Sequence, residues 1–223
     1  MKTEDLIVGL ARDSGLVRRL PHPWVRAAVW VTATTIYLAG LVLFMAPPGR
    51  LGAAFVDLRF SFEQVAAGLV GLTAGAAALT TVVPGRSRRV LVAPIVAGVL
   101  WSGIAAFGGV QDALQYGATG IPLRTDWPCV ATIVLTGSLP AAGLVHMLRR
   151  GAPLTPRITV ALAVLAAAAF ANVTACLVRP HDSSLTVLVW HGTSVLALCG
   201  VAGVLGTSVL KWSWSTHLEG TQP

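Results

Sequence analysis

Charged residues are scarce in this chain. Only 11% of the 223 residues are Asp, Glu, Lys or Arg, whereas 55% are hydrophobic and the mean hydropathy is +0.74. A soluble domain carries about a quarter charged residues, so this scarcity excludes a surface built mainly for water. The apolar residues also form long runs, in contrast to the spacing of about 3.6 residues that marks a half-buried helix.

The sequence also lacks the motifs and acidic groups of several functional classes. It has no nucleotide-binding loop, nucleophile elbow or metalloprotease motif, so we expect no enzyme. No Lys, Arg, Asp or Glu stands in the middle of an apolar run, and we therefore expect no buried carboxylate, proton relay or acidic ion site. We expect no removable signal peptide, no bound cofactor and no tightly bound small-molecule substrate.

Six apolar runs remain, and each is long enough to cross a hydrocarbon core of roughly 30 Å as a helix. They cover about residues 27–46, 64–83, 90–107, 129–147, 158–178 and 185–207. Their many Ala and Gly residues let helices approach closely in lipid. The sequence predicts an all-α fold: a polytopic membrane helical bundle of about six transmembrane helices over 27–210, with a cytoplasmic segment 1–26 and a cytoplasmic tail 211–223.

The basic residues predict the orientation of this bundle. The net charge of +7 could indicate nucleic-acid binding, but the Lys and Arg residues occur in short clusters between the runs, which is typical of cytoplasmic loops. Four of them fall on one predicted side, namely Arg50, Arg59, Arg124 and Arg179. The other twelve fall on the opposite side, so we expect both termini in the cytoplasm and no direct contact with nucleic acid.

Residues 1–26 are the most informative hydrophilic segment. Thr3 followed by Glu4 and Asp5 is typical of a helix start, with a hydroxyl cap and acids in the first turn. Apolar side chains then recur on one face, as Leu6, Ile7, Leu10, Val17 and Leu20. The segment fits either an amphipathic helix on the lipid surface or a helix that docks in a groove of a cytoplasmic partner. The two acids weaken the first alternative, because they would face anionic headgroups.

Several polar groups are predicted at one depth near the outer face. Cys129 opens the fourth run, Cys176 lies near the end of the fifth, and His181 follows in the next loop. His191 lies roughly 9 Å below the same surface. Two thiols and one or two imidazoles at this depth are compatible with a disulfide or a soft-metal site. Asn172 is expected to hydrogen-bond a neighbouring helix.

The chain resembles the NrsF-type family of membrane anti-sigma factors along nearly its whole length. The shared features are the opening Met1-Lys2-Thr3-Glu4-Asp5-Leu6-Ile7 with Leu10-Ala11, Trp127 with Cys129, Leu139-Pro140, Arg150-Gly151-Ala152-Pro153 with Pro156, Cys176, Trp190, and Leu210-Lys211-Trp212. The order and spacing of these features match those of the family.

The resemblance implies a six-span protein of the bacterial inner membrane that holds an extracytoplasmic-function (ECF) sigma factor inactive. It implies sigma-factor binding through the N-terminal segment, which places Glu4, Asp5, Leu6, Ile7, Leu10, Val17 and Leu20 at that interface. It also implies that Cys129 and Cys176 sense metal or oxidative stress, with His181 and His191 as further candidates. The chain departs from the family's His-Cys-Pro-Glu-like run, because Ala175 and Leu177 flank Cys176, and the metal chemistry stays open.

Two alternatives come from other functional classes. A small-solute or metal transporter would need a polar path through the bundle, which the sparse polar residues do not supply. A structural subunit of a larger membrane complex would use the Ala- and Gly-rich faces to bind other proteins.

Overall fold

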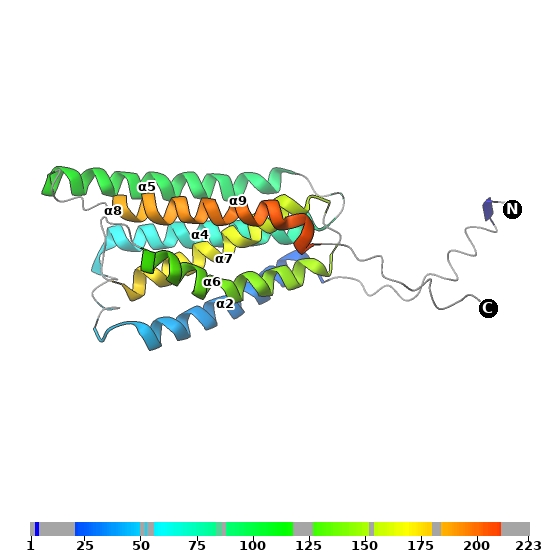
Figure 1. The fold of residues 1–223 in the computed structure, drawn as a ribbon, viewed down its shortest axis with the longest axis horizontal. Coiled ribbons are helices and arrows are strands. Elements are labelled where there is room, and N and C mark those ends of the chain that lie inside the picture. The colour runs from blue at the N-terminus through cyan, green and yellow to red at the C-terminus, as the bar shows by residue number, and fades with distance from the viewer. Residues whose placement is uncertain are drawn as a thin grey trace.

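The protein is a bundle of six long helices. The computed structural model describes residues 3–4, 21–49, 52, 56–83, 85, 88–117, 127–151, 154–179 and 184–210, and these contain no strand. Figure 1 shows the long helices lying side by side along one axis. They are α2 (Pro23–Met45), α4 (Leu58–Thr81), α5 (Val92–Tyr116), α6 (Trp127–Arg149), α7 (Pro156–Val178) and α9 (Gly192–Val209). Short pieces precede two of them, namely η1 (Arg88–Leu91), α8 (Ser184–Thr186) and the π-helical η3 (Val187–His191).

The outward faces of the bundle are apolar. Large hydrophobic side chains point away from the protein on several helices, for example Ile36, Phe44, Val99, Leu114, Leu196 and Val204. All six spans are long and apolar enough to cross a membrane, with α8, η3 and α9 together forming the last one. The predicted all-α bundle of six membrane-spanning helices is confirmed, and the chain is a multi-pass membrane protein.

The direction of the helices alternates, so the bundle has two distinct ends. We call the end where α2 begins and α9 ends the base, and the end where α6 begins and α7 ends the crown. Cys129 lies at the crown, two residues into α6, and Met147 lies at the base end of the same helix. Arg26, which the sequence placed in the soluble segment, lies inside α2 and is buried at the base.

Helix α7 occupies the centre of the bundle. It packs against α2, α4, α6 and α9, and it is the most buried of the six spans. Its sequence explains this position, because Ala163, Ala166–Ala169, Ala171 and Ala175 let four neighbours approach its backbone. Helix α5 lies at the periphery, where it packs along α4 and contacts the last span mainly through α8 and η3.

Candidate functional site

The predicted sigma-factor surface lies largely outside the described residues. Glu4 is described, and it is helical and exposed. Asp5, Leu6, Ile7, Leu10, Val17 and Leu20 lie outside the described ranges, and so does His181.

Three of the predicted sensing residues come together at the crown. Cys129 Sγ of α6 lies 2.6 Å from His191 Nε2. Cys176 Sγ of α7 lies 4.0 Å from the other ring nitrogen, His191 Nδ1. Both cysteines are in the reduced, thiol form. One imidazole from the last span therefore joins thiols from two other helices, and we call these residues, with Asn172, the thiol–imidazole cluster.

The hydrogen bonds of this cluster define the state of its histidine. His191 Nδ1 donates to Asn172 Oδ1, because an amide oxygen can only accept. This bond also confirms the expected contact of Asn172 with a neighbouring helix. In a neutral imidazole the other nitrogen is then an acceptor, so the Cys129 thiol donates to His191 Nε2. Cys176 Sγ is a weak donor to Asn172 Oδ1 at 4.0 Å.

The cluster is enclosed by small residues between α6 and α7. Cys129 and His191 are each 3% exposed, and Asn172 is 4% exposed. Cys129 packs with Ile133 and with alanines of α7 in one apolar group. The two helices are close here, since a Cβ at Gly137 would lie 3.2 Å from the Cβ of Ala171. The rings of Trp127 and Trp190, 6.2 Å apart, pack beside the cluster's helices at the crown.

A π-helical turn places His191 in the cluster. In η3 the backbone widens, and the N–H of Gly192 points at the carbonyls of both Leu188 and Val189. Such single π turns are frequent at functional sites, because the extra residue rotates the side chains that precede it. A regular helix over these residues would turn the imidazole away from its present direction.

A buried ionic cluster, which the sequence did not predict, anchors the start of the last span. Arg59 of α4 donates two hydrogen bonds of 2.8 Å to the two carboxylate oxygens of Asp112 in α5. Arg59 Nη2 also donates to Ser184 Oγ at 2.5 Å, and Ser184 Oγ donates to Glu63 Oε1 at 2.7 Å. The backbone N–H of Ser184 donates to Asp112. Ser184 opens α8, so three helices are joined immediately before η3.

This ionic cluster corrects the expectation that no carboxylate is buried. Glu63 is 7% exposed and Asp112 is 9% exposed. The reason is pairing, because a charge leaves water only when an opposite charge and hydrogen bonds compensate it. Glu63 follows Arg59 at i+4, which is the one sequence signal that pointed to a pair. The packing around the pair is tight, since a Cβ at Gly108 would lie 2.8 Å from Arg59 Nε and from Ser184 Oγ.

The thiol–imidazole cluster offers soft ligands but no complete metal site. Thiolates and imidazole suit soft or borderline metal ions. Across the described residues, no three His, Cys, Asp or Glu side chains are placed to hold one ion together.

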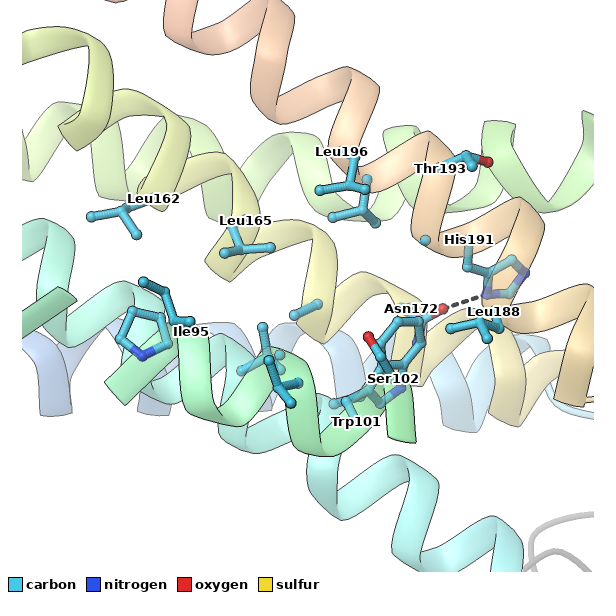
Figure 2. A pocket seen from close by; sticks show the side chains of 18 of the residues that line it. Ile95, Trp101, Ser102, Leu162, Leu165, Asn172, Leu188, His191, Thr193 and Leu196 are labelled. Carbon is cyan, nitrogen blue, oxygen red and sulfur yellow. Dashed lines mark hydrogen bonds between the residues drawn. The ribbon is translucent and has the colours of Figure 1, made fainter. Parts of the chain in front are cut away.

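An apolar cavity of about 710 Å³ reaches the cluster from the side of the bundle. It lies between α5, α7 and the last span, and Figure 2 shows Asn172 and His191 at one end of it and Ile95 and Leu162 toward the other. Trp101 and Ser102 lie near the polar end. This cavity was not predictable from the sequence, because it depends on which helices are neighbours.

Comparison with known protein families places the chain beside one whose members regulate a sigma factor. The family described as NrsF, negative regulator of sigma F, matches residues 10–212, which is most of the chain. No curated protein and no solved structure matches the chain.

Proposed function

The chain belongs to the NrsF family of negative regulators of a sigma factor, and from that premise we propose that it is a membrane-bound anti-sigma factor with a thiol sensor. It holds an ECF sigma factor through residues 1–26 and releases it when an oxidant or a soft metal ion reacts with Cys129 and Cys176. It lies in a bacterial inner membrane with both termini in the cytoplasm. It acts as a regulator and not as an enzyme.

The contact between Cys129 and His191 is the observation that carries this proposal. A thiolate, and not a thiol, attacks oxidants and binds metal ions. His191 Nε2 is an acceptor directed at the Cys129 sulfur, and Asn172 holds the opposite nitrogen in its protonated form. The imidazole can thus take the thiol proton, as the base does in a cysteine–histidine pair. Cys176, which lies against the same ring, supplies the second sulfur.

Helix α6 supports a route from the sensor to the base. It carries Cys129 at the crown, and two of its backbone carbonyls accept hydrogen bonds from side chains of α2. Trp30 Nε1 donates to the carbonyl of Pro140 at 3.0 Å, and the Arg26 guanidinium donates to the carbonyl of Met147. Arg26 lies one turn before Trp30, in the first turn of α2, and is the last residue of the predicted N-terminal segment 1–26. A shift of α6 at the cysteine site would therefore change the hydrogen bonds that fix the base end of α2.

The first half of the proposal is tested by co-purification. The full chain and a chain without residues 2–20, which keeps α2 intact, are each expressed with the ECF sigma factor encoded beside it and solubilised in mild detergent. A chain without the tail 211–223 is the matched control. We expect the full chain and the chain without residues 211–223 to retain the sigma factor, and the chain without residues 2–20 to lose it. Retention by the chain without residues 2–20 would overturn the assignment of the binding segment.

The second half is tested by release. The complex is treated with diamide or with a cadmium salt, and the free sigma factor is measured. We expect release from the wild type and from Cys199→Ser, whose cysteine lies in α9 away from the cluster. The Cys129→Ser, Cys176→Ser double variant should keep the sigma factor bound. Equal release from the double variant would contradict the sensing role.

A further inference from the structure

The apolar cavity has the length and lining of a site for a long lipid-soluble molecule. Along α7 it extends from Ile158 to Asn172, which is about 21 Å at roughly 1.5 Å per residue. Its walls along this distance are formed mainly by Leu, Ile, Val, Ala, Pro and Gly residues, and among the described residues no Lys or Arg lines it. A phospholipid headgroup would find no cation for its phosphate here, so the chemistry of the lining favours an uncharged occupant.

The inner end of the cavity carries a polar amide and a flat aromatic ring. Asn172 lines it and is 4% exposed, and its carbonyl oxygen is used by His191. Within the described part of the chain no hydrogen bond uses the amide nitrogen of Asn172, which leaves two N–H donors for an acceptor in the cavity. The flat indole of Trp101 lies beside this end, as Figure 2 shows, 3.9 Å from where a Cβ of Gly192 would be.

We propose that this cavity is a binding site for a membrane quinone, which acts as the oxidant of the thiol–imidazole cluster. The quinone ring packs beside Trp101, one of its carbonyl oxygens accepts a hydrogen bond from Asn172 Nδ2, and its isoprenoid tail follows the apolar walls toward Ile158. This proposal rests on the proposed function, because it names the oxidant that the sensor meets. The quinone is a transient redox ligand, in keeping with the expectation of no tightly bound substrate.

The redox step balances without a further reactant. His191 accepts the proton of Cys129, and the Cys129 thiolate and the Cys176 thiol together lose two electrons as a disulfide bond forms between their sulfurs. The quinone takes up both electrons and two protons, so that its two carbonyls become the hydroxyls of a quinol. The reaction consumes one quinone and two thiols and yields one quinol and one disulfide. Disulfide formation requires the two Cα atoms to come within about 7 Å, so α6 and α7 are the helices that respond.

Two glycines of α5 provide a matched pair of variants for the binding test. A Cβ at either Gly98 or Gly103 would meet no atom within 4 Å, but Gly98 lines the cavity and Gly103 does not. The full chain in lipid nanodiscs is photolabelled with an azidoquinone, with decylubiquinone as competitor. We expect saturable labelling of peptides from α5, α7 or η3, reduced about tenfold in apparent affinity by Gly98→Leu and unchanged by Gly103→Leu.

Either of two results would overturn the binding site. One is equal labelling of the two glycine variants, and the other is wild-type label found only on peptides that do not line the cavity. The second result is obtained on the wild type, so it decides the question even if Gly98→Leu fails to fold.

The redox step has its own measurement. Reduced protein is mixed with decylubiquinone without oxygen, quinol is followed by absorbance, and free thiols are counted by alkylation. We expect one quinol per chain in the wild type and none in Cys129→Ser or Cys176→Ser. Quinone that binds but leaves both thiols alkylatable would refute the step. If diamide still releases the sigma factor in that case, the proposed function stands while the quinone proposal fails.

Discussion

At the scale of single residues, His191 is the group on which the reactivity of Cys129 depends. Replacing it by Gln removes a base but keeps a side chain of similar length. We expect His191→Gln to slow the alkylation of Cys129 by iodoacetamide by a factor on the order of ten to a hundred, because a positioned base contributes rate factors of that size or larger. The rate is measured by mass spectrometry of the Cys129 peptide in the detergent-solubilised chain.

The matched control for this prediction is His146→Gln. His146 lies on the same helix as Cys129 but is exposed at the base, where it contacts Arg150. This variant should alkylate at the wild-type rate. An unchanged rate in His191→Gln would show that the close contact with the imidazole does not activate the thiol.

The sequence placed Cys129, Cys176 and His191 at one depth, but it did not show that they touch. Depth follows from counting residues along spans of known direction. Adjacency depends on the rotation of each helix, and for His191 that rotation is changed by the π turn in η3. The bond of His191 with Asn172 was likewise predictable only as a contact with some neighbouring helix.

At the scale of helices, the contact between α6 and α2 is the proposed path of the signal. The indole of Trp30 donates to the carbonyl of Pro140 and packs edge-on against Phe170, with ring centroids 5.8 Å apart. Trp30→Phe removes the donor but keeps an aromatic ring. We expect the variant to hold the sigma factor but to release less of it for a given dose of diamide, because a hydrogen bond of about 1 kcal/mol between the helices is lost.

Trp24→Phe is the control for this change. Trp24 lies on the same helix and is 59% exposed. The release curve of the Trp24→Phe variant should therefore match that of the wild type. The fraction released is measured over a series of diamide doses for all three chains. A wild-type curve for Trp30→Phe would remove this contact from the path, with the sensing role of the cysteines unaffected.

The ends of the helices were the least predictable elements of the fold. Helix α4 begins at Leu58 rather than at Gln64, and α5 continues to Tyr116 rather than ending at Phe107. The second predicted run was started only after the charged Glu63, and the third was ended at Gly108 and Gly109, shortly before Asp112. In the folded chain Arg59 pairs with Asp112 and lies 3.7 Å from Glu63, and both helices continue past these residues. A hydropathy average gives a charged residue the same value whether or not its charge is paired in the folded chain.

At the scale of the whole molecule, the six spans were predictable because each needs only length and apolar composition. The alternating direction of the helices is confirmed by the fold, in which successive long helices run in opposite directions along the bundle. Which end faces the cytoplasm is a separate prediction, made from the excess of Lys and Arg on one side. The sequence assigns twelve of the 16 basic residues to the predicted cytoplasmic side, and among the described residues Arg26, Arg149, Arg150 and Arg157 lie at the base.

Reporter fusions test this orientation, and with it the placement of the whole regulatory scheme. Alkaline phosphatase needs disulfides and is active only outside the cytoplasm, whereas green fluorescent protein fused to the same points serves as the complementary reporter. We expect phosphatase activity after Gly117 at the crown, and fluorescence without phosphatase activity after Gly151 at the base and after Pro223. The reverse pattern would put the thiol–imidazole cluster on the cytoplasmic side and residues 1–26 beyond the reach of any sigma factor, so the mechanism depends on this result.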